Sequence, residues 1–277
     1  MNSKRTTKTK VIIFDIFLIE GMILVSQKEL RNQTPLADTQ IGETAYYFPA
    51  RSGMYPQREA SSPSGLEWYP ALTSRLTAFI PGNPGAGKSY LANELINLLP
   101  PDSEVLLFTA LEEEDGNFKD LKGRLYKIRM EPENLERLTL SEIRRRCKNP
   151  ILLFDDIDKI RDKQVEKLTF KILEDALANG RGHKKHDGEG DIHVIVTSHS
   201  LNDYKKTKYT LENSDYIAVF PQSTTYAQMK RLFEKIGLTK EQCDEVMDLG
   251  RNGEIRRVII KKVAPMFIIT GNIISLL

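Results

Sequence analysis

Short apolar runs alternate with longer amphipathic segments over the middle of the chain, from residue 75 to residue 221. Apolar runs of this kind, bounded by polar or turn residues, are typical of strands buried on both faces of a sheet. The longer segments repeat apolar side chains at helical spacing. Strands that alternate with helices predict an α/β fold, with a mostly parallel sheet flanked by helices. The predicted strands are 76–80, 104–109, 125–130, 151–154, 192–197 and 216–220, and the predicted helices are 89–99, 134–147 and 162–180.

Turn residues set the ends of two of these helices. Pro100 and Pro101 end the first, because proline lacks the N–H group that a helix interior needs. Gly180 ends the third, whose apolar side chains predict one buried face. That face consists of Leu168, Ile172, Leu173, Ala176 and Leu177.

The pattern changes after residue 221. Residues 225–250 predict two helices around Gly237, and Thr239 with Gln242 has the spacing of a capping box for the second. Three apolar runs follow and predict a terminal β-hairpin or meander. They are residues 256–263, 265–270 and 273–277.

The N-terminal part differs from the rest. Residues 49–65 are rich in proline, serine and glycine and predict a linker or surface loop. The apolar run 11–25 is interrupted by Asp15 and Glu20 and is too short to span a bilayer, which favours a buried strand or helix, or an extension, over a signal or anchor. The predicted organisation is an N-terminal extension and linker (1–65), an α/β core (66–221), and a C-terminal helical pair with a β-hairpin (222–277).

Composition limits the functions that the chain can have. Hydrophobic residues make up 40% of its 277 residues, which suffices for a core and argues against a disordered chain. The net charge of +2 means that any nucleic-acid contact must be a local patch. The two cysteines, Cys147 and Cys243, have no metal-like spacing and predict a reducing, intracellular location. With no apolar run long enough to span a bilayer, no membrane partner is expected.

A glycine-rich loop follows the first predicted core strand. Residues 82–89 read GNPGAGKS, which fits G-x-x-x-x-G-K-[ST] between a strand and a helix. Successive N–H groups of such a loop form a nest for anions, and the helix adds its positive end. Lys88 is predicted to reach the β- and γ-phosphates of a nucleotide, and Ser89 to bind Mg²⁺. The predicted nucleotide-binding residues are Gly82, Asn83, Pro84, Gly85, Ala86, Gly87, Lys88, Ser89 and Tyr90.

A pair of carboxylates follows the apolar strand ILLF. Asp155 and Asp156 would reach the carboxyl edge of the sheet, where α/β sheets bind ligands. Asp155 is predicted to hold Mg²⁺ with Ser89, and Asp156 to act as the base that orients the attacking water. Asp158 fits better as an acid at a helix start. A third strand, IHVIVT, leads to His199, the first candidate for contact with the γ-phosphate ahead of Ser198 or Thr197.

The order of these motifs resembles the FtsK/HerA superfamily, specifically the poxvirus-type DNA-packaging ATPases of large DNA viruses. The resemblance covers residues 75–221 and rests on GNPGAGKS, LLFDDID, GRGH, IHVIVTSHS and ENSDYIAVF. Arg181 and His183 match the Arg-His element of that family, His199 its polar sensor, and Asn213 with Asp215 its Asn–Asp segment.

The sequence departs from that family at two positions. His199 replaces the usual glutamine, and no arginine precedes the Asn–Asp segment, where Lys208 is the nearest basic residue. The resemblance implies an ATP- and Mg²⁺-dependent motor that moves double-stranded DNA as a homo-oligomeric ring. It further implies a capsid or portal partner and a location in the host cytoplasm or the virion.

Two alternatives stay open on the residues alone. An AAA+-type ATPase, such as a replication loader or remodeller, would use residues 226–249 as a helical lid with Arg231 as its sensor. A nucleotide-dependent binding module with little turnover is the other. The absence of an N-K-x-D motif favours ATP over GTP. The candidates for an arginine finger are Arg144, Arg145, Arg146, Arg251, Arg256 and Arg257, and for the first three a helix C-terminus with a solvated face is the simpler interpretation.

Overall fold

The computed structural model divides the chain into two compact units. One comprises Met1–Thr73 with Asn272–Leu276, and the other comprises Ser74–Gly271 with Leu277. The residues that the structure describes are 11–12, 37–38, 44–45, 75–111, 116–182, 190–199, 204–251, 256–263, 267–270 and 273–276. The domain boundaries inferred from the sequence stay predictions.

In the first unit the described residues form short antiparallel pairs. Strand β1 (Val11–Ile12) pairs with β12 (Ile273–Leu276), and β2 (Ala37–Asp38) pairs with β3 (Thr44–Ala45). The rest of the apolar run 11–25 and the linker 49–65 lie outside the described residues.

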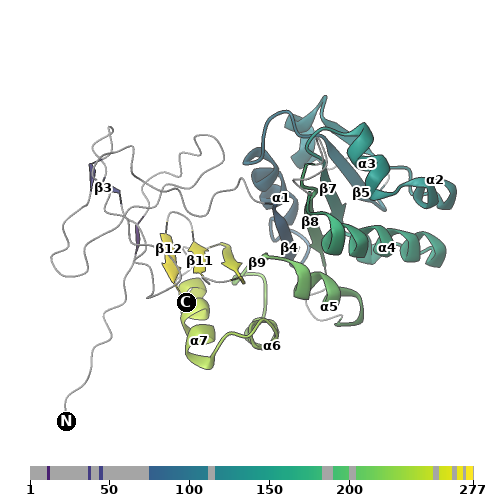
Figure 1. The fold of residues 1–277 in the computed structure, drawn as a ribbon. Helices are drawn as coiled ribbons and strands as arrows, with labels where there is room; N and C mark the ends of the chain where they lie inside the picture. Colours follow the sequence, from purple (N-terminus) through teal and green to yellow (C-terminus); the bar gives the residue numbers. More distant parts are fainter. Residues whose placement is uncertain are drawn as a thin grey trace, which may run out of the picture. The chain divides into compact units, whose positions relative to one another are not determined.

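The second unit is built on one mostly parallel sheet, as the sequence predicts (Figure 1). The strand order is β11-β10-β9-β4-β8-β7-β5-β6. All neighbours from β9 to β6 are parallel, whereas β10 is antiparallel to both β9 and β11. The strands are β4 (Thr77–Pro81), β5 (Val105–Thr109), β6 (Leu125–Lys127), β7 (Ile151–Asp155), β8 (His193–Ser198), β9 (Tyr216–Val219), β10 (Val258–Lys261) and β11 (Phe267–Thr270).

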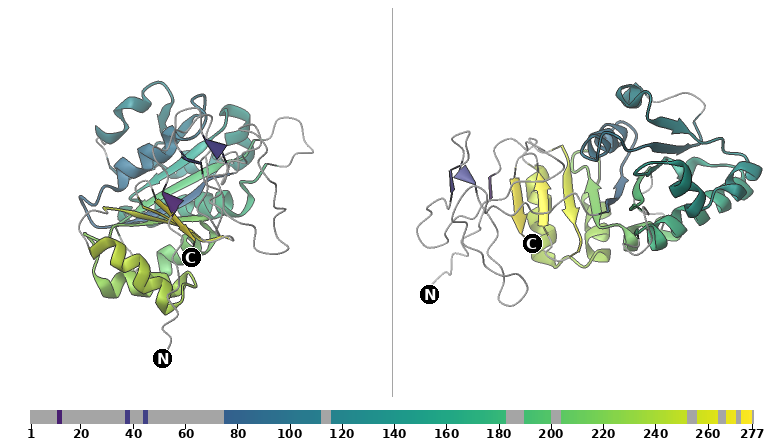
Figure 2. Two further views of the ribbon diagram at one scale, coloured as in Figure 1. Left: turned by 90° about the vertical axis from the view of Figure 1, so that its left-hand side faces the viewer. Right: turned by 45° about the horizontal axis from the view of Figure 1, so that its top comes forward.

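Helices cover both faces of this sheet. Because parallel strands are joined by right-handed crossovers, α1 (Lys88–Asn97) and the 3-10 helix η2 (Gly116–Leu121) lie on one face, and the helices that lead back across the sheet lie on the other (Figures 1 and 2). The second group comprises α2 (Pro132–Arg137), α3 (Leu140–Arg146), α4 (Lys163–Asn179) and α5 (Tyr204–Asn213).

Apolar side chains of the strands hold these layers together. Every residue of β4, β5, β7, β8 and β9 is buried, as expected for strands with helices on both sides. The rings of Phe108 and Phe154 stack across two of these strands with centroids 4.5 Å apart. The predicted apolar face of α4 is buried at Ile172, Leu173, Ala176 and Leu177, whereas Leu168 is half-buried.

The C-terminal helices and strands form as predicted. Helices α6 (Tyr226–Lys235) and α7 (Lys240–Arg251) flank Gly237. At the start of α7 the Thr239 N–H donates to Gln242 Oε1 at 2.8 Å, and the Gln242 N–H donates to Thr239 Oγ1 at 3.3 Å, which confirms the capping box. Apolar residues of both helices join the core on the face that also carries α4.

Two helices differ from their sequence predictions. The segment 134–147 forms α2 and α3 instead of one helix, because Thr139 caps a new helix and accepts a hydrogen bond from the Glu142 N–H at 3.3 Å. Helix α5 was not predicted, because two of its buried residues, Thr207 and Thr210, are polar. No helix among the described residues has the length and apolar character needed to cross a membrane.

A histidine inside the sheet makes stability depend on pH. His193 is 8% exposed, and its Nδ1 accepts the Leu76 N–H at 3.0 Å. Burial, with a smaller contribution from Arg75, lowers the pKa of His193 to about 4, although Asp191 acts in the opposite direction. The folded protein therefore holds this imidazole neutral at pH values where the unfolded chain binds a proton.

We expect the free energy of unfolding to decrease as the pH falls from 6.5 towards about 4, by up to about 3 kcal/mol from this residue. Above the unfolded pKa both states are neutral, so the contribution is fully present there. Urea unfolding at about pH 7 and about pH 5 measures the decrease. His193→Asn keeps an acceptor without a titrating ring and should reduce the pH dependence; an unchanged dependence would assign it to other groups.

Candidate active site

The glycine-rich loop has the backbone that its sequence predicts. Gly85 and Gly87 adopt φ angles of 77° and 100°, in the left-handed region that favours glycine. Gly82 is needed for a different reason, because a Cβ atom there would lie 2.9 Å from the Phe220 ring. Each motif glycine therefore has a physical role in shaping the loop.

Neighbouring strands fix the loop in place. The Gly82 N–H donates to the carbonyl of Ser198 at the end of β8, at 2.9 Å. On the other side, the Asn83 side chain donates to the carbonyl of Ser223, in the turn after β9. The loop thus lies at the carboxyl ends of the parallel strands, where sheets of this kind bind ligands.

Lys88 is a buried cation with distant partners. Its side chain is 6% exposed, and its Nζ lies 3.5 Å from the Asn83 carbonyl oxygen and 3.7 Å from Asp156 Oδ1. Burial lowers the pKa of Lys88, and the nearby carboxylates of Asp156 and Asp155 partly oppose this effect. A buried ammonium group is stabilised by close anionic partners, so the arrangement favours binding of an anion such as a phosphate.

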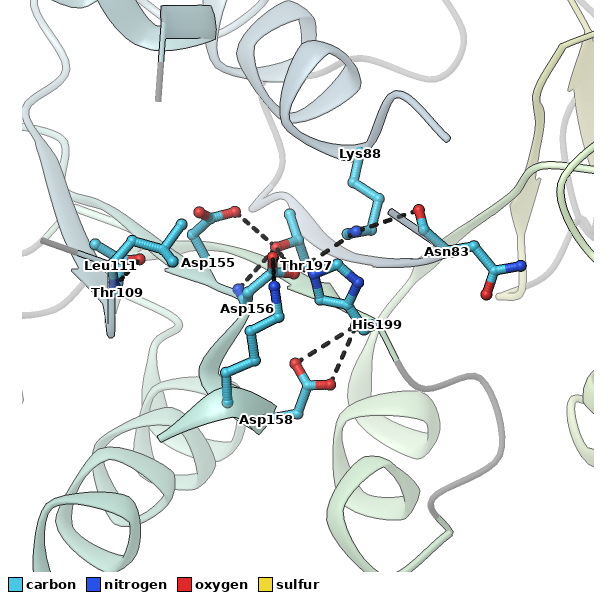
Figure 3. Close-up of polar contacts among 10 residues, drawn as sticks. Asn83, Lys88, Thr109, Leu111, Asp155, Asp156, Asp158, Thr197 and His199 are labelled. Carbon is cyan, nitrogen blue, oxygen red and sulfur yellow. Dashed lines mark hydrogen bonds and ion pairs between the residues drawn. The ribbon is translucent and has the colours of Figure 1, made fainter. Parts of the chain in front are cut away.

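Thr197 joins the two candidate aspartates (Figure 3). Its hydroxyl donates to Asp155 Oδ1 at 2.7 Å and accepts the Asp156 N–H at 3.0 Å. Because a hydroxyl has one proton, its 3.4 Å approach to Asp156 Oδ1 is a secondary contact. Thr197 lies on β8, between β4 and β7, so it sets the spacing between the loop and the aspartates.

Asp156 has an unusual backbone and several charged neighbours. Its φ of 49° lies in the left-handed region, which is uncommon for residues other than glycine, although aspartate and asparagine tolerate it better than most. Its Oδ2 lies 2.5 Å from His199 Nε2 and 3.4 Å from Lys159 Nζ, and Lys88 approaches Oδ1. A carboxylate only accepts hydrogen bonds, so His199 Nε2 carries the proton in this contact.

His199 and Asp158 extend the cluster. The backbone N–H of His199 donates to Asp158 Oδ2 at 3.2 Å, so Asp158 orients the segment that carries the histidine ring (Figure 3). Asp158 also lies in the first turn of the 3-10 helix η3 (Ile157–Lys159), as expected for an acid at a helix start. His199 contacts the candidate base directly, whereas its predicted contact with a γ-phosphate stays a prediction.

Asp155 and Ser89 suit a magnesium ion whose remaining ligands would come from a nucleotide and from water. Among the described residues no group of three or more histidine, cysteine or acidic side chains could hold a metal by itself. Mg²⁺ commonly binds one or two carboxylates together with substrate phosphates and water. Asp155 supplies a buried carboxylate, and Ser89 lies half-buried in the first turn of α1. A Mg²⁺ site at Ser89 and Asp155 stays a prediction.

Four of the candidate arginines lie at opposite ends of the strands, three at the amino ends and one at the carboxyl ends. Arg144 donates to the carbonyls of Asn179 and Arg181, and Arg145 and Arg146 pair with Glu142, all near the amino ends of β7 and β8. Those ends lie opposite Asp155, so these arginines do not reach this site. Arg181 is also exposed at the amino ends of the strands. Arg257 lies instead at the carboxyl ends of the parallel strands, where the glycine-rich loop also lies, and it pairs with Glu94 of α1.

The sequence missed two residues that shape the site: Phe220 packs against the loop, and Lys159 approaches the candidate base. Arg257, predicted only as a candidate arginine finger, pairs with Glu94 of α1 from its position just before β10. Only the position of Lys159, three residues after Asp156, could have been read from the chain. His183, the second residue of the predicted Arg-His element, lies outside the described residues.

The strand–loop–helix, its buried lysine and the paired aspartates define a P-loop nucleoside triphosphatase. Residues 78–217, half of the chain, match the model of the ATPase family associated with various cellular activities (AAA). The chain belongs to this AAA family of ATPases and is therefore an ATP hydrolase that binds nucleotide. The prediction of a P-loop ATPase is confirmed.

A viral protein and several solved structures are similar to this chain. "Uncharacterized protein V3" of Sputnik virophage is 32% identical over 209 residues, which cover 74% of this chain and 78% of that protein. The cytoplasmic domain of the Thermomonospora curvata type VII secretion ATPase EccC is 12% identical, with a TM-score of 0.43, over 72% of this chain. The pCW3 conjugation coupling protein TcpA with ATPγS is 12% identical, with a TM-score of 0.42, over 73%.

The matched region spans only part of these two structures, 25% of the EccC chain and 59% of the TcpA chain.

Proposed function

We propose that this chain is a Mg²⁺-dependent ATPase that moves double-stranded DNA, as a packaging motor of a large DNA virus. The observation that carries its ATPase part is that Thr197 joins Asp155 to Asp156 while Lys88 approaches Asp156. The P-loop backbone and Lys88 would hold the phosphates, and Ser89 and Asp155 would hold Mg²⁺. Bound there, Mg²⁺ would neutralise charge on the β- and γ-phosphates.

Asp156 would act as the base in this mechanism. Its carboxylate would accept a hydrogen bond from the attacking water and orient it towards the γ-phosphate. Thr197 holds both aspartates in register, and the contact of His199 with Asp156 Oδ2 fixes the orientation of the carboxylate. His199 is then a positioning residue for the base, in addition to its predicted contact with the γ-phosphate.

Two observations support the packaging type. Strands β10 and β11 extend the sheet beyond β9, which the packaging type predicts. Apolar residues of α6 and α7 pack into the core on the face of α4, whereas a helical lid of the AAA+ loader type would fold over the nucleotide. The similar protein from a virophage supports a viral origin. A location in the host cytoplasm or the virion and a capsid or portal partner are further parts of the proposal.

A ring is part of the proposal. Three of the candidate arginine fingers, Arg144, Arg145 and Arg146, lie at the edge of the sheet opposite the P-loop, so they could act only on a nucleotide that a neighbouring subunit binds. A homo-oligomeric ring would place such an edge against the next active site. The second candidate function, an AAA replication loader or remodeller, is favoured by the family match itself.

ATP turnover with and without duplex DNA tests the proposal. We expect duplex DNA to stimulate phosphate release, with an effect that falls as salt rises because phosphate contacts release counterions. Light scattering on the same sample measures the assembly mass, which should be that of a ring. A turnover rate that ignores DNA at every salt concentration would favour the remodeller. The absence of turnover despite ATP binding would favour a binding module.

A further inference from the structure

The orientation of the nucleotide follows from the order of the strands. The P-loop follows β4, and the groups that would act on the γ-phosphate lie on β7 and β8, on one side of it. In a nucleotide bound in this way the base end would extend away from β8, towards β9 and β10 on the other side. Two side chains there belong to neither the phosphate site nor the metal site, namely Tyr90 and Arg257.

Tyr90 is exposed directly beside the phosphate-binding loop. It follows Ser89 in the first turn of α1, and its side chain is 57% exposed, although its neighbours Leu91 and Ala92 are buried. Helical side chains lean towards the amino end of the helix, so this ring leans towards the P-loop. An exposed aromatic ring next to a phosphate site is a surface on which a nucleobase can stack.

Arg257 holds this ring from a distant part of the chain. Its guanidinium carbon lies 5.9 Å from the centroid of the Tyr90 ring, within the range of a cation–π contact. The same guanidinium pairs with Glu94, one turn along α1 from Tyr90. Arg257 precedes β10, whose first residue Val258 pairs with Val219 at the end of β9. The contact therefore joins α1 to the side of the sheet towards which the base extends.

We propose that Tyr90 is the stacking platform for the base of the bound nucleotide and that Arg257, anchored by Glu94, is its positioning residue. A purine is favoured over a pyrimidine, because its two rings cover more of the tyrosine face. This inference rests on the proposed ATPase site. It adds residues that would contact the base, so they would contribute to the binding of a nucleotide but not to the binding of its phosphates alone.

Calorimetric titration with ATP and with inorganic tripolyphosphate, which has no base, tests the inference. Tyr90→Ala should weaken ATP binding about 5- to 100-fold and leave tripolyphosphate binding unchanged. Tyr90→Phe keeps the ring and should retain ATP affinity. Arg257→Met should weaken ATP binding to a smaller extent, again without affecting tripolyphosphate. Tyr126→Ala removes an exposed tyrosine at the far edge strand β6 and should change neither affinity.

The outcomes separate this inference from the ATPase proposal. If Tyr90→Ala weakens both ligands equally, or neither, the base site is overturned while the phosphate site stands. If the wild-type protein binds neither ligand, the ATPase proposal fails and the base site fails with it. The stacking platform is supported if Tyr90→Ala lowers the affinity for ATP but not for tripolyphosphate, and if Tyr90→Phe keeps the wild-type affinity for ATP.

Discussion

Replacing Asp156 with asparagine is expected to lower ATP turnover about 10²- to 10⁴-fold while ATP binding persists. The variant removes the carboxylate that would accept the hydrogen bond of the attacking water. Asparagine tolerates the left-handed backbone better than most residues, so a φ of 49° should be retained. Phosphate release under multiple turnover, together with equilibrium binding of ATP, measures both parts of the prediction.

Asp158→Asn is the matched control for this variant. Asp158 lies two residues away and accepts the His199 N–H, and an asparagine oxygen can still accept it. Turnover of this control should stay close to that of the wild type. If Asp156→Asn also keeps wild-type turnover, another group must orient the water, and the assigned role of Asp156 is wrong.

Replacing Lys88 with methionine is expected to weaken ATP binding about 10- to 100-fold, the effect of losing one or two charge-assisted hydrogen bonds. Lys88 is 6% exposed, and its distances to Asn83 and Asp156 exceed those of a strong pair. Phosphate oxygens would therefore provide its closest partners. Methionine fills a similar volume, so the fold should persist, and calorimetric titration measures the loss.

Lys159→Met is the control for a general effect of removing one positive charge near Asp156. Lys159 also approaches Asp156, at 3.4 Å, but its side chain is 45% exposed. Exposed ion pairs contribute only about 0–1 kcal/mol, so ATP affinity should change little in this variant. Equal losses in the two variants would indicate a general effect of positive charge and would contradict a specific contact of Lys88 with phosphate.

The core of this fold can be predicted from the sequence, because the residues that mark each strand and the glycine-rich loop locally are the same residues that pack or bend there in the folded protein. The buried strands are mostly apolar, and Gly82, Gly85 and Gly87 appear where the loop needs glycine. The adjacency of β4, β8 and β7 follows from no local pattern. The bridge from Thr197 to Asp155 and Asp156 therefore became visible only when the strands were placed side by side.

The features that the sequence did not predict depend on contacts between distant segments. Arg257 meets Tyr90 because β10 pairs with β9, and nothing near either residue in the chain indicates this contact. Helix α5 forms although Thr207 and Thr210 are among its packed residues. In both cases tertiary packing decides a structure for which local propensity is weak.

The central claim is that the P-loop and the paired aspartates bind one magnesium-bound ATP. A crystal structure of Asp156→Asn with Mg²⁺ and ATP tests it most directly, because slow turnover should preserve the nucleotide. We expect the β- and γ-phosphates to contact Lys88 and the metal ion to lie between Ser89 and Asp155. A triphosphate bound away from residues 82–89, or a metal ion that approaches neither Ser89 nor Asp155, would contradict the account.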